Sequence, residues 1–307
     1  MTAWGKPTSI IINSNVMQKR KTAIITLVLL PLWTMAQTVT SPNGNVSVKF
    51  SLSDSGQPTY EMHYKGKTVC KPSHLGLELA KDKHASKGMD ETDLMDGFKE
   101  TSHKITSFDE TWRPVWGETA TIRNNYNEMQ VDLNQPQTKR NITIRFRVYD
   151  YGMGLRYEFP QQEQLNYFVI KEEHTQFAMA GDHTAYWIPG DYDTQEYEYQ
   201  ITPLTGIKDI IRRDREKYKS NSSTTVFSDT GVQTSLQMKS SDGLYINIHE
   251  AACLDYLRVV AHTRRRGQKG LHTDTFQLAL ENGARQRRRS RHALMQAYAE
   301  PQRAVQD

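Results

Sequence analysis

Alternation of apolar and polar residues with a period of two runs through residues 38–256 and limits what this chain can fold into. It is clearest over residues 46–52, 142–148 and 244–248, and Pro42-Asn43-Gly44-Asn45 supplies a turn before the first of these runs. Because successive side chains of a β-strand point to opposite faces, such runs predict strands that bury one face. We therefore expect most of this region to be β-structure.

The spacing of turns and of apolar residues refines this expectation. A Gly-containing stretch over residues 149–154 separates the run at 142–148 from a second alternating run at 155–159, which predicts a β-hairpin. A clear helical spacing of apolar residues occurs only once, just before a charged stretch. It comprises Leu204, Ile207, Ile210 and Ile211. Many strands, regular turns and little helix favour an all-β fold, a large antiparallel β-sandwich.

Residues 1–36 have the layout of a secretory signal peptide. A Lys-Arg-Lys stretch at 19–21 precedes an apolar run at 22–33, and Ala36 marks the expected cleavage site. The run is shorter than the roughly 18 residues that a membrane helix needs, and no longer run exists, so we expect no membrane span. A retained anchor or a buried helix is the alternative. The signal predicts a periplasmic protein, with residues 1–16 as an upstream extension.

Charge and cysteine content exclude several classes of protein. The net charge is −7 over residues 37–256 and +7 over residues 257–307, so the body is acidic, whereas a nucleic-acid-binding protein carries its basic patch on the folded body. Two cysteines are too few for a disulfide scaffold or a Cys-rich zinc module. In an exported protein Cys70 and Cys253 either pair or remain separate buried thiols. The body contains no phosphate-binding loop and no Ser-His-Asp order.

One aromatic cluster is a candidate for sugar binding. Trp112 and Trp116 lie four residues apart, close to Arg113 and Glu118. Tryptophan rings stack on the apolar face of a sugar while a carboxylate or guanidinium binds its hydroxyl groups. The alternative is packing in the core of the sandwich.

Two acidic clusters are further candidates. Asp191, Asp193 and Glu196 lie within six residues and can bind a hard cation, although their spacing is not that of a Ca²⁺ loop and a solvated acidic turn is the alternative. Glu250 shares a strand face with Ile246 and Ile248, so it either ends the strand in water or points into a cavity.

Several longer motifs resemble glycoside hydrolase family 97, in particular the N-terminal domain of its starch-utilisation α-glucosidases. The resemblance covers residues 38–256, and the motifs are Trp112-Arg-Pro-Val-Trp-Gly-Glu118, Tyr157-Glu-Phe-Pro-Gln-Gln162, Tyr167-Phe-Val-Ile-Lys-Glu-Glu173, Trp187-Ile-Pro-Gly-Asp-Tyr-Asp-Thr-Gln-Glu196 and Ile248-His-Glu-Ala251. It implies a galactose-mutarotase-like β-super-sandwich at residues 37–256 that packs against a (β/α)₈ barrel. In the family that barrel holds the catalytic carboxylates, and a Ca²⁺ lies in the active site.

The resemblance also implies roles for individual residues. Glu196 matches the carboxylate that the sandwich contributes to Ca²⁺, and Glu250 is expected near the junction with the barrel. We expect Glu250, Trp187 and Trp116 to contact an α-linked oligosaccharide, and we expect no catalytic residue and no activity from this chain alone. A free-standing carbohydrate-binding module is the alternative function.

Residues 257–307 differ in character from the body, because two Arg-Arg-Arg stretches appear and the alternation stops. One interpretation is a basic arm for nucleic acid or an anionic membrane. The other is a shifted reading frame: moving the codons of residues 274–283 forward by one nucleotide permits Thr-Pro-Phe-Asn-Ser-Pro-Trp-Arg-Thr, which resembles a family motif downstream of His-Glu-Ala. We expect the second, and with it an irregular, disordered tail.

Overall fold

The computed structural model describes residues 36–80, 93–165, 168–190, 195–219, 231–252, 260–264, 275–279, 285–286 and 292–298. The chain divides into two compact units, residues 1–33 and residues 34–307, and every described residue belongs to the second. Apart from Ala36, the predicted signal peptide therefore lies outside the described residues. No helix within the described ranges has the length and apolar character needed to cross a membrane.

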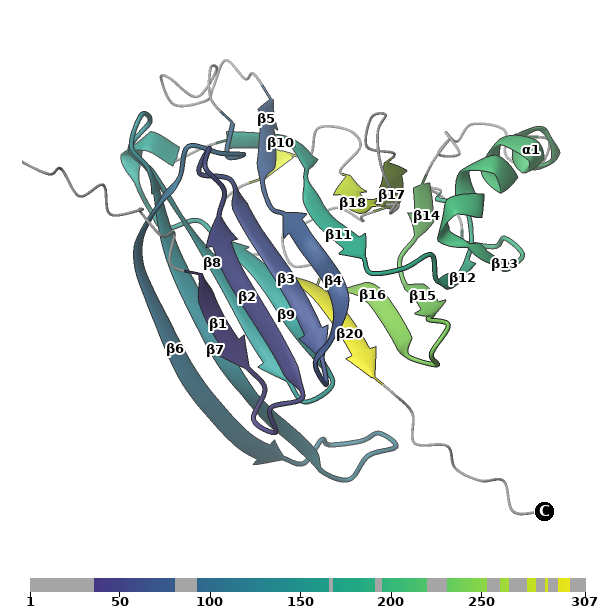
Figure 1. Cartoon of the computed structure of the whole chain (residues 1–307), viewed down its shortest axis with the longest axis horizontal. Helices are drawn as coiled ribbons and strands as arrows, with labels where there is room; N and C mark the ends of the chain where they lie inside the picture. The colour runs from purple at the N-terminus through teal and green to yellow at the C-terminus, as the bar shows by residue number, and fades with distance from the viewer. Residues whose placement is uncertain are drawn as a thin grey trace, which may run out of the picture. The chain divides into compact units, whose positions relative to one another are not determined.

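Two large sheets and one small sheet contain the described strands (Figure 1). The eight-stranded sheet has the order β1 (Gln37–Thr40), β2 (Val46–Leu52), β3 (Pro58–Tyr64), β4 (Lys67–His74), β11 (Thr175–Met179), β18 (Thr275–Ala279), β17 (Val260–Arg264), β14 (Gly231–Gln233). The nine-stranded sheet has the order β13 (Gln200–Pro203), β12 (Thr184–Trp187), β15 (Leu236–Lys239), β16 (Tyr245–Ala252), β20 (His292–Tyr298), β9 (Gly152–Glu158), β8 (Arg140–Tyr149), β7 (Ile122–Gln135), β6 (Lys99–Trp112). The small sheet has the order β19 (Arg285–Gln286), β10 (Phe168–Glu173), β5 (Leu77–Ala80).

The prediction of a mostly β fold with antiparallel sheets and one helix is confirmed. Every named strand pair in the described ranges is antiparallel. The three alternating runs form β2, β8 and β16, and the predicted hairpin is the pair β8 and β9. Apart from the 3₁₀ turns η1 (Glu163–Leu165) and η2 (Leu204–Gly206), the helix is α1 (Ile207–Lys219).

The core contains the apolar side chains that alternate along strands of both large sheets. On β2, Val46, Val48 and Phe50 are fully buried, and on β8 the same holds for Ile144 and Phe146. The ring of Phe146 lies 6.1 Å from that of Phe50 and 6.0 Å from that of Tyr60 on β3, so the two sheets meet face to face in this region. Each such burial stabilises the fold by about 1.5–3 kcal/mol, which explains why alternation identified the strands.

Helix α1 follows from the apolar spacing recognised in the sequence. Ile207 and Ile211, one turn apart, are buried, and Leu204 is buried in the preceding η2 turn. Asp209 lies in the first turn, where a negative charge interacts favourably with the helix dipole. The helix thus buries one apolar stripe and presents Asp209, Arg212 and Arg213 to solvent.

The basic segment 257–307 contributes backbone to all three sheets. Strand β18 lies between β11 and β17 in the first large sheet, and β20 lies between β16 and β9 in the second. The rest of the segment lies outside the described residues, as do the side chains of these strands. The hypothesis of a shifted reading frame and a disordered tail stays a prediction.

Cys70 is a free, fully buried thiol on β4. Its Sγ lies 3.1 Å from the Ser73 hydroxyl oxygen, and burial raises the pKa of the thiol to about 11. Cys253 lies outside the described residues. At Cys70 the structure therefore agrees with the interpretation of a separate buried thiol.

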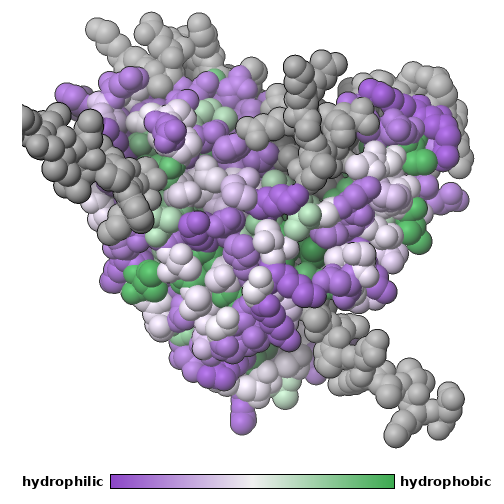
Figure 2. All heavy atoms as spheres, in the orientation of Figure 1, coloured by the Kyte–Doolittle hydropathy of each residue, from purple (hydrophilic) through white to green (hydrophobic). Residues whose placement is uncertain are grey.

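Polar and weakly polar residues predominate on the face seen in Figure 2, and apolar residues are confined there to small patches. Several large apolar side chains are nevertheless exposed along and beyond β6: Ile105, Phe108, Trp112, Val115 and Trp116.

Candidate functional site

The segment that carries Glu196 connects β12 to β13 at one end of the nine-stranded sheet. These two strands pair antiparallel, with Trp187 at the end of β12 opposite Gln200 at the start of β13. The Trp187 indole is buried, and its Nε1 donates a hydrogen bond of 2.9 Å to the Thr202 hydroxyl oxygen. Glu196 is exposed. The strands therefore hold both ends of a connection on which Glu196 faces solvent.

The first part of this connection is also anchored to β14. The Gly190 amide donates to the Gly231 carbonyl at 2.8 Å, and the Gln233 amide donates to the Ile188 carbonyl at 3.0 Å. Backbone hydrogen bonds on both sides of Pro189 fix the direction in which the chain leaves the sheet. Residues 191–194, with Asp191 and Asp193, lie outside the described residues.

The register of the sheet places Glu250 at the edge from which this connection leaves. Gln237 on β15 lies opposite Tyr186 on β12 and opposite Asn247 on β16. Strands β12 and β16 both pair antiparallel with β15, so they run in the same direction and their C-terminal ends reach the same edge. The backbone of Glu250 lies three residues beyond Asn247, towards that edge. The Glu250 side chain lies outside the described residues.

Trp116 lies far along the sheet from this edge. It belongs to the connection between β6 and β7, and β6 ends the strand order opposite to β12 and β13. The Trp116 side chain is 88% exposed, and Trp112 at the end of β6 is 47% exposed. The strand order thus places the backbones of Trp187 and Glu250 towards the C-terminal ends of β12 and β16, with β15 between these strands, and does not place Trp116 beside them. The interpretation of Trp112 and Trp116 as core residues does not hold in this structure.

A row of aromatic rings crosses the β6 end of the same sheet. Phe108 and Tyr126 lie opposite each other, with centroids 5.1 Å apart, and Tyr149 lies 5.2 Å from Tyr126. Tyr151 continues the row at 5.7 Å, and the Arg147 guanidinium lies 4.7 Å above the Tyr126 ring. Phe108 and Tyr126 are nearly parallel, with their faces towards each other, so the row stabilises neighbouring strands. Sequence reasoning missed it because the pairing depends on register.

An ion-pair network lies beside this row on β7, β8 and β9. Arg145 donates to Glu128 and, at 2.9 Å from both Nε and Nη2, to the two carboxylate oxygens of Glu158. Arg147 Nε donates to Glu128 at 2.6 Å. Burial alone would raise the pKa of Glu128, but hydrogen bonds from Arg147 and Arg145 outweigh it, and the pKa is lowered. The carboxylate is therefore held in its charged form.

The calcium role of Glu196 stays a prediction, and its carboxylate can supply only part of such a site. Ca²⁺ takes about 6–8 oxygen ligands, and one exposed carboxylate supplies at most two of them. Within the described ranges, no group of three metal-binding side chains includes Glu196.

Comparison with known proteins agrees with this architecture. The model of the family described as glycosyl-hydrolase 97 N-terminal matches residues 39–294. A glycoside hydrolase family 97 enzyme from Pseudoalteromonas sp. strain K8, solved in complex with acarbose, is 30% identical, with a TM-score of 0.65. A variant of the same enzyme solved with panose is 29% identical, also with a TM-score of 0.65. Each match covers 85% of this chain and 35% of the solved chain.

A more distant structure shares the fold. A β-arabinopyranosidase matches with a TM-score of 0.59 at 16% identity, over 85% of this chain and 40% of that one. The chain therefore spans only about a third of the length of the family 97 enzymes that it matches. Because the family model covers most of the chain, the chain belongs to the N-terminal domain family of glycosyl hydrolases 97.

Proposed function

We propose that this chain is the N-terminal, carbohydrate-associated domain of an exported, calcium-dependent α-glucosidase that hydrolyses α-glucosidic bonds in starch oligosaccharides. The observation that carries the proposal is the family match over residues 39–294, and a structural match to about 35% of a family 97 enzyme solved with acarbose supports it. Acarbose and panose are α-linked oligosaccharides, which supports an α-glucoside as the substrate class. The fold would be the galactose-mutarotase-like super-sandwich, and the location the periplasm.

The catalytic groups would lie in a (β/α)₈ barrel outside this chain. Glycosidic hydrolysis uses two carboxyl groups on either side of the scissile bond, about 6.5–9.5 Å apart in an inverting enzyme. In this proposal the sandwich supports the barrel, Glu196 donates one carboxylate ligand, and Glu250 lines the junction on the same edge. A bound Ca²⁺ would supply positive charge next to the substrate. Trp187, which is buried, would contribute by holding the β12–β13 connection.

Turnover by the purified chain tests whether the catalytic groups lie in the barrel rather than in the sandwich. We expect no hydrolysis of p-nitrophenyl α-glucoside in the presence of Ca²⁺, because the proposal places the catalytic pair in the barrel and gives this chain one calcium ligand. A purified α-glucosidase, assayed in parallel, is the positive control. Turnover by this chain at a rate near that of the control would contradict the proposal.

The metal role of Glu196 is tested with terbium(III), a luminescent substitute for calcium. Tyr197 and Tyr199 follow Glu196 closely in the chain and can sensitise terbium emission. We expect the chain to bind terbium(III) weakly. Glu196→Gln should abolish this binding, and Glu198→Gln should leave it unchanged. Glu198 is a matched control, since it is an exposed glutamate on the same connection. Equal binding by the two variants would remove Glu196 from the proposal.

Exposure of Trp112 and Trp116 favours one alternative, a free-standing carbohydrate-binding module. Titration calorimetry of the chain with maltooligosaccharides distinguishes the two. Binding that is lost in Trp116→Ala and kept in Val115→Ala, a fully exposed neighbour, would support the module. Absence of heat with every maltooligosaccharide would support a domain that only completes the site of the barrel.

A further inference from the structure

A cluster of three metal-binding side chains lies on the small sheet, apart from the Glu196 edge. Glu78 lies on β5, Glu172 lies on β10, and His174 follows β10 directly. One ligand atom from each of the three can be chosen so that all lie within 4.8 Å of one another. No sequence motif indicated this site, because Glu78 is almost a hundred residues from the other two.

The backbone holds these residues in a defined arrangement. Glu78 and Glu172 are direct partners across the antiparallel pair β5 and β10. Glu172 and His174 are two residues apart, so an extended chain directs both to one side. The His174 amide donates a hydrogen bond of 2.9 Å to the carbonyl of Gly76, which directly precedes β5, so the backbone of His174 is fixed next to this strand. The site is therefore built on paired backbone.

The adjacent carboxylate on β10 is used differently. Glu173 is buried, and its Oε1 accepts a hydrogen bond of 2.5 Å from the Thr175 hydroxyl. Glu173 also points away from its neighbours Glu172 and His174, as alternation along a strand requires. The cluster thus consists of the three partly exposed side chains, which are reachable from solvent.

Two carboxylates in direct opposition across a strand pair repel each other and destabilise the pair. Both approach the same imidazole nitrogen: His174 Nε2 lies 3.5 Å from Glu78 Oε2 and 3.9 Å from Glu172 Oε2. These distances exceed the roughly 2.7–2.9 Å of a charge-assisted hydrogen bond.

The distances suit three ligands of one cation. Two ligand atoms at about 2.0–2.1 Å from a tetrahedral Zn²⁺ are themselves about 3.3–3.4 Å apart. The His174–Glu78 separation of 3.5 Å is already close to this value, the His174–Glu172 separation of 3.9 Å exceeds it by about half an ångström, and the two carboxylate ligand atoms lie within 4.8 Å of each other, so binding would draw the carboxylates closer together. An imidazole with two carboxylates is a donor set for Zn²⁺, whereas Ca²⁺ prefers oxygen ligands only.

We propose that Glu78, Glu172 and His174 form a zinc site that links β5 to β10, with the fourth position open to water. The side chains are 16% exposed at His174, 26% at Glu78 and 34% at Glu172, so the ion can enter from solvent. The site is separate from the calcium role of Glu196 and does not depend on it.

Zinc titration of the full chain tests the proposal. The protein is purified without a polyhistidine tag, stripped of metal with a chelator, and titrated by calorimetry and against a chromophoric chelator. We expect one equivalent of Zn²⁺ to bind tightly, with affinity reduced at least tenfold in His174→Gln and in Glu78→Gln. Millimolar Ca²⁺ should not displace the ion. Substitution with Co²⁺ should give the visible absorption bands of a tetrahedral site.

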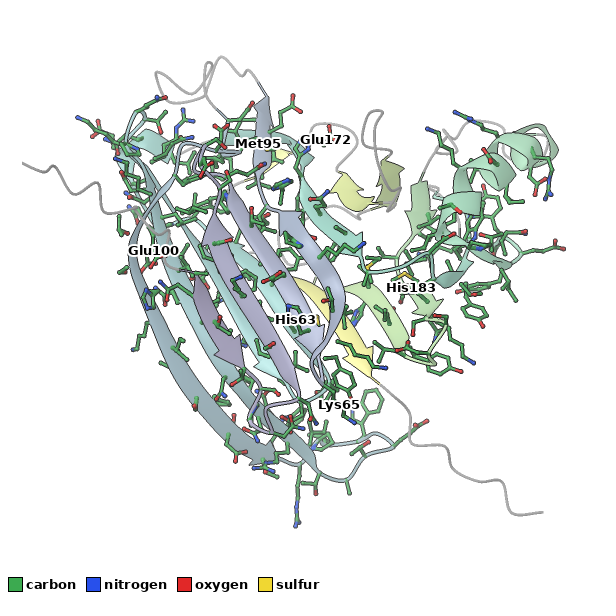
Figure 3. All side chains as sticks on the ribbon, in the orientation of Figure 1. His63, Lys65, Met95, Glu100, Glu172 and His183 are labelled. Carbon is green, nitrogen blue, oxygen red and sulfur yellow. The ribbon has the colours of Figure 1, made fainter. Side chains whose placement is uncertain are left out.

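His63→Gln is the matched control. His63 on β3 also lies 3.9 Å from a carboxylate, but its ion pair is with Glu61 alone, whereas His174 approaches two carboxylates. Figure 3 labels His63 and Glu172. We expect this variant to bind Zn²⁺ within twofold of the parent chain. Glu172→Gln, which changes the most exposed of the three side chains, keeps the test valid when another variant fails to fold. Absence of stoichiometric binding, or binding unchanged in the cluster variants, would overturn the proposal and leave a histidine-carboxylate ion pair.

Discussion

The indole Nε1 of Trp187 donates a hydrogen bond of 2.9 Å to the hydroxyl oxygen of Thr202. Trp187 ends β12 and Thr202 lies in β13, so this bond joins the two strands from which the Glu196 connection emerges. This hydrogen bond satisfies the buried Trp187 N–H and links β12 to β13 at this end of the sheet. Trp187 therefore has a structural task at the site, whatever contact with substrate it makes in a larger enzyme.

Loss of this acceptor should destabilise the domain. Thr202→Val keeps the shape of the side chain but leaves the buried Trp187 Nε1 without the Thr202 oxygen, which costs about 1–3 kcal/mol. Urea denaturation followed by tryptophan fluorescence measures the free energy of unfolding. Thr184→Val, at an exposed position of β12, is the control and should change it by less than about 0.5 kcal/mol. Equal effects of both substitutions would contradict the structural task.

Contact between the two large sheets depends strongly on Phe146. Its ring packs against Phe50 and Tyr60, and the side chain is fully buried. Phe146→Ala should lower the free energy of unfolding by about 3–5 kcal/mol, because it removes apolar area and leaves a cavity. Phe108→Ala, which removes a ring that is 39% exposed, should cost clearly less. Thermal or urea denaturation of the two variants compares them, and a larger loss for Phe108→Ala would count against the sandwich.

Charge at Glu128 should make stability depend on pH. Its pKa is lowered from the ordinary value of 4.5, so its contribution is fully present above 4.5 and is lost as the pH falls through the lowered value. Glu128→Gln should therefore cost about 1.5–3 kcal/mol at pH 7, and the difference from the parent chain should shrink below pH 4.5. Denaturation at several pH values measures this. Glu163→Gln, at an exposed position, is the control, and a pH-independent difference for Glu128→Gln would contradict the prediction.

The Cys70 thiol should be unreactive in the folded protein. Burial raises its pKa to about 11, so almost none of it is thiolate at pH 8, and the side chain has no access to solvent. In a Cys253→Ser background, a thiol reagent such as Ellman's reagent should label Cys70 only after denaturant is added. Labelling within minutes in native buffer would show that β4 is not covered as described.

Sequencing of the gene tests the origin of the basic segment. The hypothesis of a shifted frame predicts an insertion or deletion of nucleotides close to codon 257. An uninterrupted frame across codons 250–283 would refute it, and the arginines of residues 264–266 would then need a role of their own.

Local patterns in the sequence identified the elements, because each depends on residues close together in the chain. Alternation at Val46, Val48 and Phe50 predicts a strand with one buried face, and the spacing of Ile207 and Ile211 predicts the helix. The motifs also indicated the family, since they preserve local order. The metal role of Glu196 and the substrate contacts of Glu250, Trp187 and Trp116 stay predictions.

Tertiary structure alone decided which distant residues meet. The order of strands places Trp116 and Trp187 towards opposite ends of one sheet, and the register between β5 and β10 brings Glu78 to Glu172 and His174. Periodicity reports which face of a strand is buried but carries no information about its neighbour. Strand pairing is settled by the packing of the whole core, and for that reason the three-residue cluster was invisible until the fold was known.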